Sequence, residues 1–249
     1  GAKIPYESVT IVPAVGNSPN AAVAAARLGL KTALITDLGA DDHGDKALTT
    51  LTNEKVDTGF VNRHEGKKTN YHYVLWYQDD RTILIKHEEY SYSFPEVNGP
   101  KWIYLSSLGE HSLPYHAMIE EYLKAQAQVK LAFRPGTFQI SLGAEKLKGI
   151  YERSEILFCN RQEAQKILGT EIQEIKKLLN GLGQLGPKTV VITDGKNGAY
   201  VFDGRKSWFM PPYPDPQAPL ERTGAGDAFA STMTIALALG KSIPEALAW

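Results

Sequence analysis

Short apolar runs alternate along the chain with longer segments of helical character. The runs are rich in β-branched residues and are typical of buried strands; they are 31–39, 101–109, 129–133, 154–160 and 189–195. The intervening segments are predicted helices; they are 20–29, 45–54, 115–128, 161–169 and 171–186. This alternation predicts an α/β fold with a mostly parallel sheet covered by helices. Ligands of such sheets bind beyond the carboxyl ends of the strands.

One region departs from the alternation. Residues 68–91 contain two extended runs joined by a polar turn, which predicts a β-hairpin with no helix directly after it. We expect the extended run 7–13 to join this hairpin in a small separate sheet, serving as a lid or a dimer contact. An ordinary surface hairpin is the alternative. The expected organisation is one domain over 1–249, with a lid from about 5–14 and 68–91.

Composition narrows the class of protein. The chain has 249 residues, 43% of them hydrophobic, and a formal net charge of −1. Its charges are interspersed, so we expect neither nucleic acid nor a membrane as partner, and the composition suits a cytoplasmic enzyme. The single cysteine, Cys159, excludes an internal disulfide and is expected to be a buried structural thiol. The chain starts at Gly1 and stops inside a helical pattern at Trp249, which predicts a fragment of a longer protein.

The stretch ERTGAGDAFA, residues 221–230, places two glycines and an aspartate at the mouth of an apolar helix. The glycines allow a tight turn and leave backbone N–H groups uncovered. A helix start adds unpaired donors and partial positive charge, so the stretch could seat an anion. The alternative is a plain glycine turn, with Asp227 favourable to the helix dipole.

Three further motifs each allow a structural and a functional interpretation. Asn160 to Glu163 opens a helix directly after a strand and has the pattern of a capping box, although both side chains could also face a Mg²⁺ ion through its waters. Residues 191–204 join two strands through a turn whose glycines allow a ligand to approach. Residues 16–29 begin a helix with polar residues that could cap it or bind a polyol, and capping is the favoured interpretation. The chain has neither a Walker-type glycine loop nor a GxSxG elbow, and its histidines have no metal-binding spacing.

Taken together and in this order, these motifs resemble the PfkB carbohydrate kinase family, also called ribokinase-like. TGAGDAF is similar to the C-terminal signature of that family, and GNSPNAAVAAARLG with DLGADDHG to its N-terminal signature. NRQE resembles its NxxE motif, TDGKNGAY its nucleotide-side loop, and DDRTIL its lid hairpin. The resemblance implies a three-layer α/β/α, ribokinase-like fold with a small β-sheet lid. It also implies ATP-dependent phosphorylation of a hydroxymethyl group.

The resemblance assigns roles to the matching residues. Asp227 would be the general base and would also bind the substrate, and an anion hole would surround the transferring phosphoryl group; its members are Gly224, Ala225 and Gly226. Asn160 and Glu163 would hold Mg²⁺, through water, and the ATP phosphates. The remaining assignments are nucleotide contacts by Thr193, Gly195 and Gly198, and substrate contacts by Gly16, Asn17, Asn20 and Glu110. The family also implies a homodimer formed through the lid.

The sequence departs from the family pattern at several positions. Val15 stands in place of the first of two adjacent glycines, and Arg134 follows a strand where members often carry Asp or Asn. Glu221, followed by Arg222, stands where the family commonly has the aspartate of a monovalent-cation site, which weakens the expectation of K⁺ activation. The family's first strand and last helices are missing from the chain, so we expect weak binding or slow turnover.

The substrate stays open at this point. The leading hypothesis is a sugar kinase that uses ATP and Mg²⁺. Aromatic residues of the lid suit a nucleoside; they are Tyr71, Tyr73, Trp76 and Tyr77. Cations suit a sugar phosphate; they are Lys67, Lys68, Arg81, Lys86 and Arg134. A non-catalytic sugar- or nucleotide-binding relative is the alternative of a different class.

Overall fold

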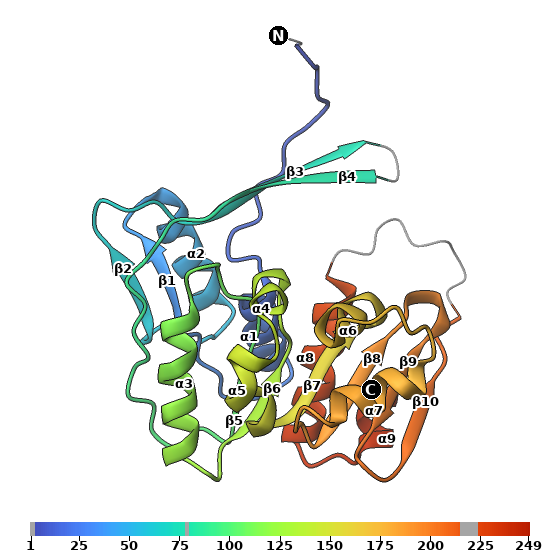
Figure 1. Cartoon of the computed structure of the whole chain (residues 1–249). Helices are drawn as coiled ribbons and strands as arrows, with labels where there is room; N and C mark the ends of the chain where they lie inside the picture. The colour runs from blue at the N-terminus through green and yellow to red at the C-terminus, as the bar shows by residue number, and fades with distance from the viewer. Residues whose placement is uncertain (1–2, 78–79, 215–223) are drawn as a thin grey trace.

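The structure, a computed structural model, describes residues 3–77, 80–214 and 224–249. A six-stranded sheet lies at its centre, in the order β10-β9-β8-β7-β6-β5 (Figure 1). Its strands are β5 (Trp102–Leu105), β6 (Lys130–Phe133), β7 (Ser154–Asn160), β8 (Thr189–Thr193), β9 (Ala199–Phe202) and β10 (Ser207–Met210). Strands β5 to β8 run parallel, and β9 and β10 continue the sheet antiparallel. The expectation of a mostly parallel sheet is confirmed.

Alternate residues of each strand supply the two faces of the sheet. In β7, Leu157 and Cys159 belong to one buried cluster, and Ile156 and Phe158 belong to the other. This period of two explains why the strands read as continuous apolar runs. Cys159 is buried as expected, and burial raises the pKa of its thiol.

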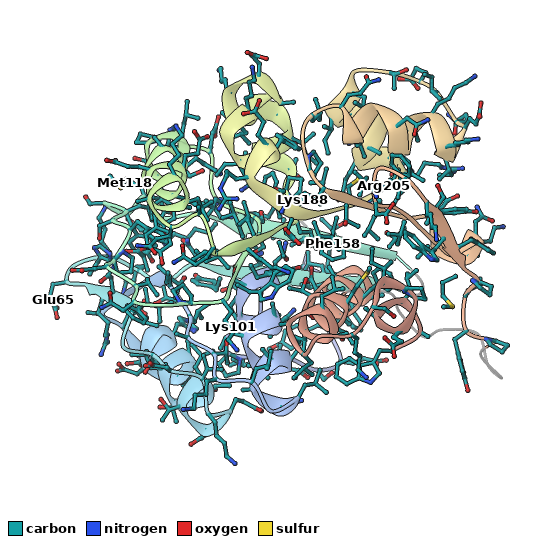
Figure 2. All side chains as sticks on the ribbon, turned by 90° about the horizontal axis from the view of Figure 1, so that it is seen from below. Glu65, Lys101, Met118, Phe158, Lys188 and Arg205 are labelled. Atoms are coloured by element: carbon teal, nitrogen blue, oxygen red, sulfur yellow. The ribbon has the colours of Figure 1, made fainter. Side chains whose placement is uncertain are left out.

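Helices cover both faces of this sheet and form the outer layers of a three-layer α/β/α fold (Figure 2). One face is covered by α3 (Leu113–Ala125), α5 (Lys148–Arg153), α6 (Arg161–Leu168) and α7 (Ile175–Gly183). The other is covered by α8 (Ala225–Ala238) and α9 (Ile243–Ala248), with α1 (Asn17–Arg27) against α8 and β5. Short elements follow β6, namely α4 (Thr137–Leu142) and the 3-10 turn η1 (Glu145–Leu147). Within the described residues, no helix has the length and apolar character needed to cross a membrane.

Two small sheets lie beside the large one. The strand predicted at 31–39 is shorter, β1 (Thr36–Gly39), and pairs in parallel with β2 (Val61–His64) beside α2 (Asp42–Asn53). The predicted hairpin is present as β3 (Tyr71–Tyr77) and β4 (Asp80–Lys86), which project away from the layers (Figure 1).

The strand predicted over 7–13 is not formed. These residues are extended but pair with neither β3 nor β4, and their apolar side chains, such as Val9 and Ile11, are exposed. A β-branched run becomes a strand only where a neighbouring strand accepts its hydrogen bonds, and no strand pairs with this segment among the described residues.

Candidate active site

The carboxyl edge of the parallel strands brings four segments of the chain together. Ser106 follows β5, Arg134 follows β6, Asn160 ends β7 and Thr193 ends β8. Because β5, β6, β7 and β8 are neighbours in that order, these residues line one edge in sequence. The register pairs Asn160 directly with Thr193. The site expected beyond the strand ends therefore has its components at one edge.

The GAGD turn begins α8 at this edge. Gly224 is the N-cap, with φ of 79° in the left-handed region where glycine is favoured, and it supplies no side-chain cap. Ala225, Gly226 and Asp227 form the first helical turn, whose N–H groups have no partners within the helix. The expected seat for an anion is thus geometrically present. Residues 221–223 lie outside the described residues. Glu221 and Arg222, on which the expectation about K⁺ rests, are among them.

Arg134 reaches across from β6 to the acid of this turn. Its Nη1 lies 2.6 Å from Oδ1 of Asp227, and the two side chains are only 20% and 13% exposed. An added Cβ on Gly226 would come within 2.9 Å of Arg134 Nη2, so the guanidinium packs directly on the turn. The base predicted from the sequence is therefore held by a cation that follows a different strand.

Two buried polar atoms near this pair lack a well-directed hydrogen bond among the described residues: Asp227 Oδ1 and the Tyr104 hydroxyl. The contact between Arg134 and Asp227 is consequently a close pairing of charges rather than an aligned hydrogen bond. Burial raises the pKa of Tyr104, the charge of Asp227 raises it further, and Arg134 opposes the rise, so the three groups interact. Buried polar atoms without partners are costly, so a donor that reached either atom would stabilise it. Sequence reasoning missed Tyr104. The available signal was a polar hydroxyl group within a strand that is otherwise apolar.

On the substrate side, the predicted capping of α1 by its polar residues is wrong. The N-cap is Gly16, which forms no side-chain cap. Ser18 instead bonds across to the Ser106 hydroxyl at 2.5 Å and ties α1 to the end of β5. Asn17 and Asn20 lie half-buried in the first turn, and neither makes a side-chain hydrogen bond within the described residues. They are therefore available to a polar ligand.

A buried hydrogen-bond network supports this wall of the site. Gln139 donates to the Ser106 carbonyl at 3.1 Å and to His116 Nε2 at 3.0 Å, and its Oε1 accepts from the Gly136 N–H at 2.7 Å. His116 Nδ1 is bonded to the Ser112 carbonyl at 2.8 Å, so it must carry the proton. The ring is then neutral, in agreement with burial lowering the pKa of His116. The side-chain polar atoms of Gln139 and His116 thus all take part in hydrogen bonds, and these bonds hold the loop after β5 in place.

On the other side, the capping box predicted at Asn160 is confirmed. Asn160 Oδ1 accepts from the Glu163 N–H and Glu163 Oε2 accepts from the Asn160 N–H, both at 2.8 Å. The capping role does not exclude a metal role, because a carboxylate accepts several hydrogen bonds or ligands at once. Glu163 offers hard oxygen ligands of the kind Mg²⁺ prefers, although no three His, Cys, Asp or Glu side chains among the described residues are grouped so that they could hold a metal ion. The donor set fits an ion that keeps water and phosphate oxygens as its other ligands.

The loop after β8 contains the remaining nucleotide-side residues. Gly195 has φ of 52°, in the left-handed region that favours glycine, and open space around its missing side chain. Gly198 has a different reason to be glycine, because an added Cβ would lie 2.3 Å from the Met210 carbonyl oxygen. Sequence reasoning missed an ion pair across the two strand ends, Arg161 Nε to Asp194 Oδ1 at 3.2 Å. This ion pair could have been predicted, because residues of opposite charge directly follow β7 and β8, which are neighbours in the sheet.

Glu110 is not brought into contact with these groups. It is exposed in the turn between β5 and α3. A hollow of 340 Å³ lies at the opposite, amino end of β8, lined by residues that include Asn180, Lys188 and Phe202, and does not overlap the candidate site.

Comparison with known proteins identifies the family of the chain. The sequence pattern of the pfkB family carbohydrate kinases matches residues 10–249. The chain is 28% identical to the cytidine kinase of Thermococcus kodakarensis, over 92% of this chain and 82% of that protein. It is 26% identical to the ribokinase of Bacillus subtilis, over 93% of this chain and 76% of that protein.

Among solved structures, the fructokinase of Vibrio cholerae O395 in its fructose-, ADP- and calcium-bound form superposes with a TM-score of 0.74 at 22% identity. The match covers 94% of this chain and 82% of the fructokinase, and it shows the fold. With the fold, the order of motifs and the family match in agreement, the chain belongs to the pfkB family of carbohydrate kinases.

Proposed function

We propose that the protein is an ATP-dependent carbohydrate kinase that transfers the γ-phosphoryl group to a hydroxymethyl group of a sugar. The observation that supports it most is the Asp227 carboxylate, which lies largely buried at the mouth of the GAGD turn without a well-directed donor. A substrate hydroxyl would supply the missing donor. An acceptor hydroxyl beside uncovered N–H groups is what phosphoryl transfer requires.

Each residue then has one task. Asp227 orients the hydroxyl and accepts its proton, and N–H groups of the Gly224 to Gly226 turn stabilise charge on the phosphoryl oxygens. The sugar is bound from the start of α1 by Gly16, Asn17 and Asn20; the side chains of the two asparagines make no hydrogen bond to another described residue. Glu110 is exposed here, so we propose that it contacts the sugar only after sugar binding has moved its loop toward the site.

The nucleotide would lie along the ends of β7 and β8. Thr193, Gly195 and the tight Gly198 turn shape that side, and Asn160 and Glu163 face the phosphates. Mg²⁺ bound there through water would neutralise phosphate charge and keep the γ-phosphoryl group in line with the acceptor. In this proposal K⁺ has no assigned ligand.

A nucleoside kinase of the same family is the second candidate. The cytidine kinase relative favours it, as does the aromatic surface of the hairpin. Tyr71 stacks on His43 with ring centroids 5.0 Å apart, and Tyr73 and Trp76 are exposed. A base could stack there if β3 and β4 close over the site.

In the same closed form the hairpin, with residues 5–14 beside it, would act as the lid of a single domain, and its apolar side chains could meet a second copy. We propose the cytoplasm as the location.

The test is ADP release in the presence of ATP and Mg²⁺ over a panel of ribose, fructose, fructose phosphates, other hexoses and nucleosides. Turnover on sugars supports the proposal, and turnover on nucleosides alone selects the second candidate. Binding of a sugar or nucleotide without turnover on any member of the panel would indicate a non-catalytic relative and refute the proposed function.

A further inference from the structure

Arg134 is a departure from the pattern of the family, and its position gives it a chemical role. Its backbone is fixed, since its N–H donates to the Leu105 carbonyl at 2.9 Å. Its guanidinium spans from Asp227 Oδ1 to the backbone at Gly226. The same side chain thus touches the proposed base and the proposed anion hole.

The charge balance of the site explains why a cation is useful there. Asp227 is negative, and the γ-phosphoryl group that must come close to it is negative as well. Their repulsion is strong in a partly buried site, where screening by water is weak. A positive group lying between the carboxylate and the turn offsets this repulsion without leaving the site.

The guanidinium also has donors to spare. It carries five N–H groups in a planar fork that matches phosphate oxygens. Within the described residues its one ionic partner is Asp227, through Nη1. Nη2 lies next to Gly226 in the first turn of α8, since a Cβ added to this glycine would come within 2.9 Å of it. The guanidinium and the uncapped first turn of α8 therefore lie together where the proposed function puts the transferring phosphoryl group.

We propose that Arg134 is a second catalytic residue, which binds the transferring γ-phosphoryl group while paired with Asp227. The proposal rests on the proposed function, because it needs a nucleotide in the site. It differs from a purely structural clamp, which would hold α8 against β6 whatever the ligand. It also differs from recognition of an anionic sugar, which would leave the affinity for nucleotide unchanged.

The test compares Mg²⁺ complexes of a non-hydrolysable ATP analogue and of ADP by calorimetry, in the wild type and in Arg134→Met. We expect Arg134→Met to lower the analogue affinity about tenfold or more, the usual size of a charge-assisted hydrogen bond, and to leave ADP affinity unchanged. The matched control is Arg205→Met, which removes the same charge from an exposed loop and should change neither affinity.

A double-mutant cycle with Asp227→Asn sharpens the test. Removing the carboxylate charge should strengthen analogue binding when Arg134 is present and have a smaller effect in the Arg134→Met background. If Arg134→Met does not fold, Arg134→Lys keeps the charge without the fork and should retain part of the analogue affinity.

The outcomes separate the two proposals. Equal loss of analogue and ADP affinity, or no loss of either, would overturn the role of Arg134 while leaving a kinase that still turns over. A folded wild type that binds neither nucleotide would remove the proposed function, and the role of Arg134 with it.

Discussion

Two helices begin at the same edge of the sheet, and both carry an acid at the third helical position. In α6 the acid is Glu163, which bonds back to the N–H of its own cap at 2.8 Å. In α8 the acid is Asp227, and its cap, Gly224, has no side chain to offer. Instead of bonding back to the cap, Asp227 pairs with Arg134 from another strand. The same local pattern thus completes one helix start and leaves the other open.

The difference lies in what each helix start leaves for a ligand. In α6 the two side chains satisfy each other and stabilise the helix. In α8 the first-turn N–H groups remain uncapped by side chains, and a buried carboxylate oxygen lacks an aligned donor. A protein retains such unsatisfied groups chiefly where a ligand completes them. We therefore infer that α8 supplies the chemistry and α6 chiefly supports it.

The largest effect is expected at Asp227. Asp227→Asn keeps the shape but removes the base, so kcat should fall by roughly 10² to 10⁴, the usual contribution of general base catalysis. Nucleotide affinity should not fall, whereas thermal stability should drop because the largely buried Arg134 loses its charged partner. Steady-state kinetics with calorimetry and thermal unfolding measure all three. Unchanged turnover would show that Asp227 is not the base.

Gly226→Ala should separate activity from stability. The new methyl group would lie 2.9 Å from Arg134 Nη2 and displace a flexible side chain rather than backbone. We expect kcat to fall about tenfold or more through misplacement of the guanidinium, while alanine favours the helix and keeps the melting temperature. Gly224→Ala is not a matched control, because its φ of 79° would strain alanine. A variant with normal kcat would argue that Arg134 is not needed in its present place.

Glu163 offers a test of the other helix start through two variants. Glu163→Gln can still accept the hydrogen bond from the Asn160 N–H, so stability should change little, whereas Glu163→Ala should cost about 1 kcal/mol. If the carboxylate faces Mg²⁺, both variants should raise the Mg²⁺ concentration needed for half-maximal rate. Chemical denaturation and Mg²⁺ titrations supply the two readouts. An unchanged Mg²⁺ requirement would leave Glu163 with capping alone.

The smallest effect concerns the start of α2, which is capped by Asp41. Burial opposes ionisation of Asp41, but hydrogen bonds from the Thr69 side chain and from the Gly44 and Thr69 N–H groups, with the charge of Lys68, lower its pKa to about 2. Because the pKa is lower in the folded protein than its ordinary 3.8, this stabilisation is present above that value and is lost as pH falls toward about 2.

The check for Asp41 is the free energy of unfolding between neutral and acid pH. Asn caps a helix as well as Asp but lacks the charge that favours a helix N-terminus, so Asp41→Asn should lower it by up to about 1 kcal/mol at neutral pH and by progressively less toward acid pH. Its exposed neighbour Asp42 provides the control variant, Asp42→Asn. A difference between wild type and Asp41→Asn that did not shrink in acid would contradict the role of the charge.

Local signals account for much of what could be predicted. β7 and the capping box after it follow directly from SEILFCNRQE, because a buried strand and a cap both depend on neighbouring residues. The strand expected over 7–13 failed because a strand also needs a partner. The predicted capping of α1 failed because the helix begins one residue after Gly16, and the Ser18 hydroxyl inside it bonds to Ser106, far along the chain. The pair of Arg134 with Asp227 could not be foreseen either, since only the folded sheet edge brings them together.

The central claim is that the edge formed by Asp227 and the GAGD turn transfers a phosphoryl group to a bound hydroxymethyl group. The most direct measurement follows γ-labelled ATP with the best substrate of the panel and locates the label in the products. The account predicts labelled phosphate on the hydroxymethyl oxygen of the substrate. Label that stays on ATP, although both nucleotide and sugar bind, would contradict it.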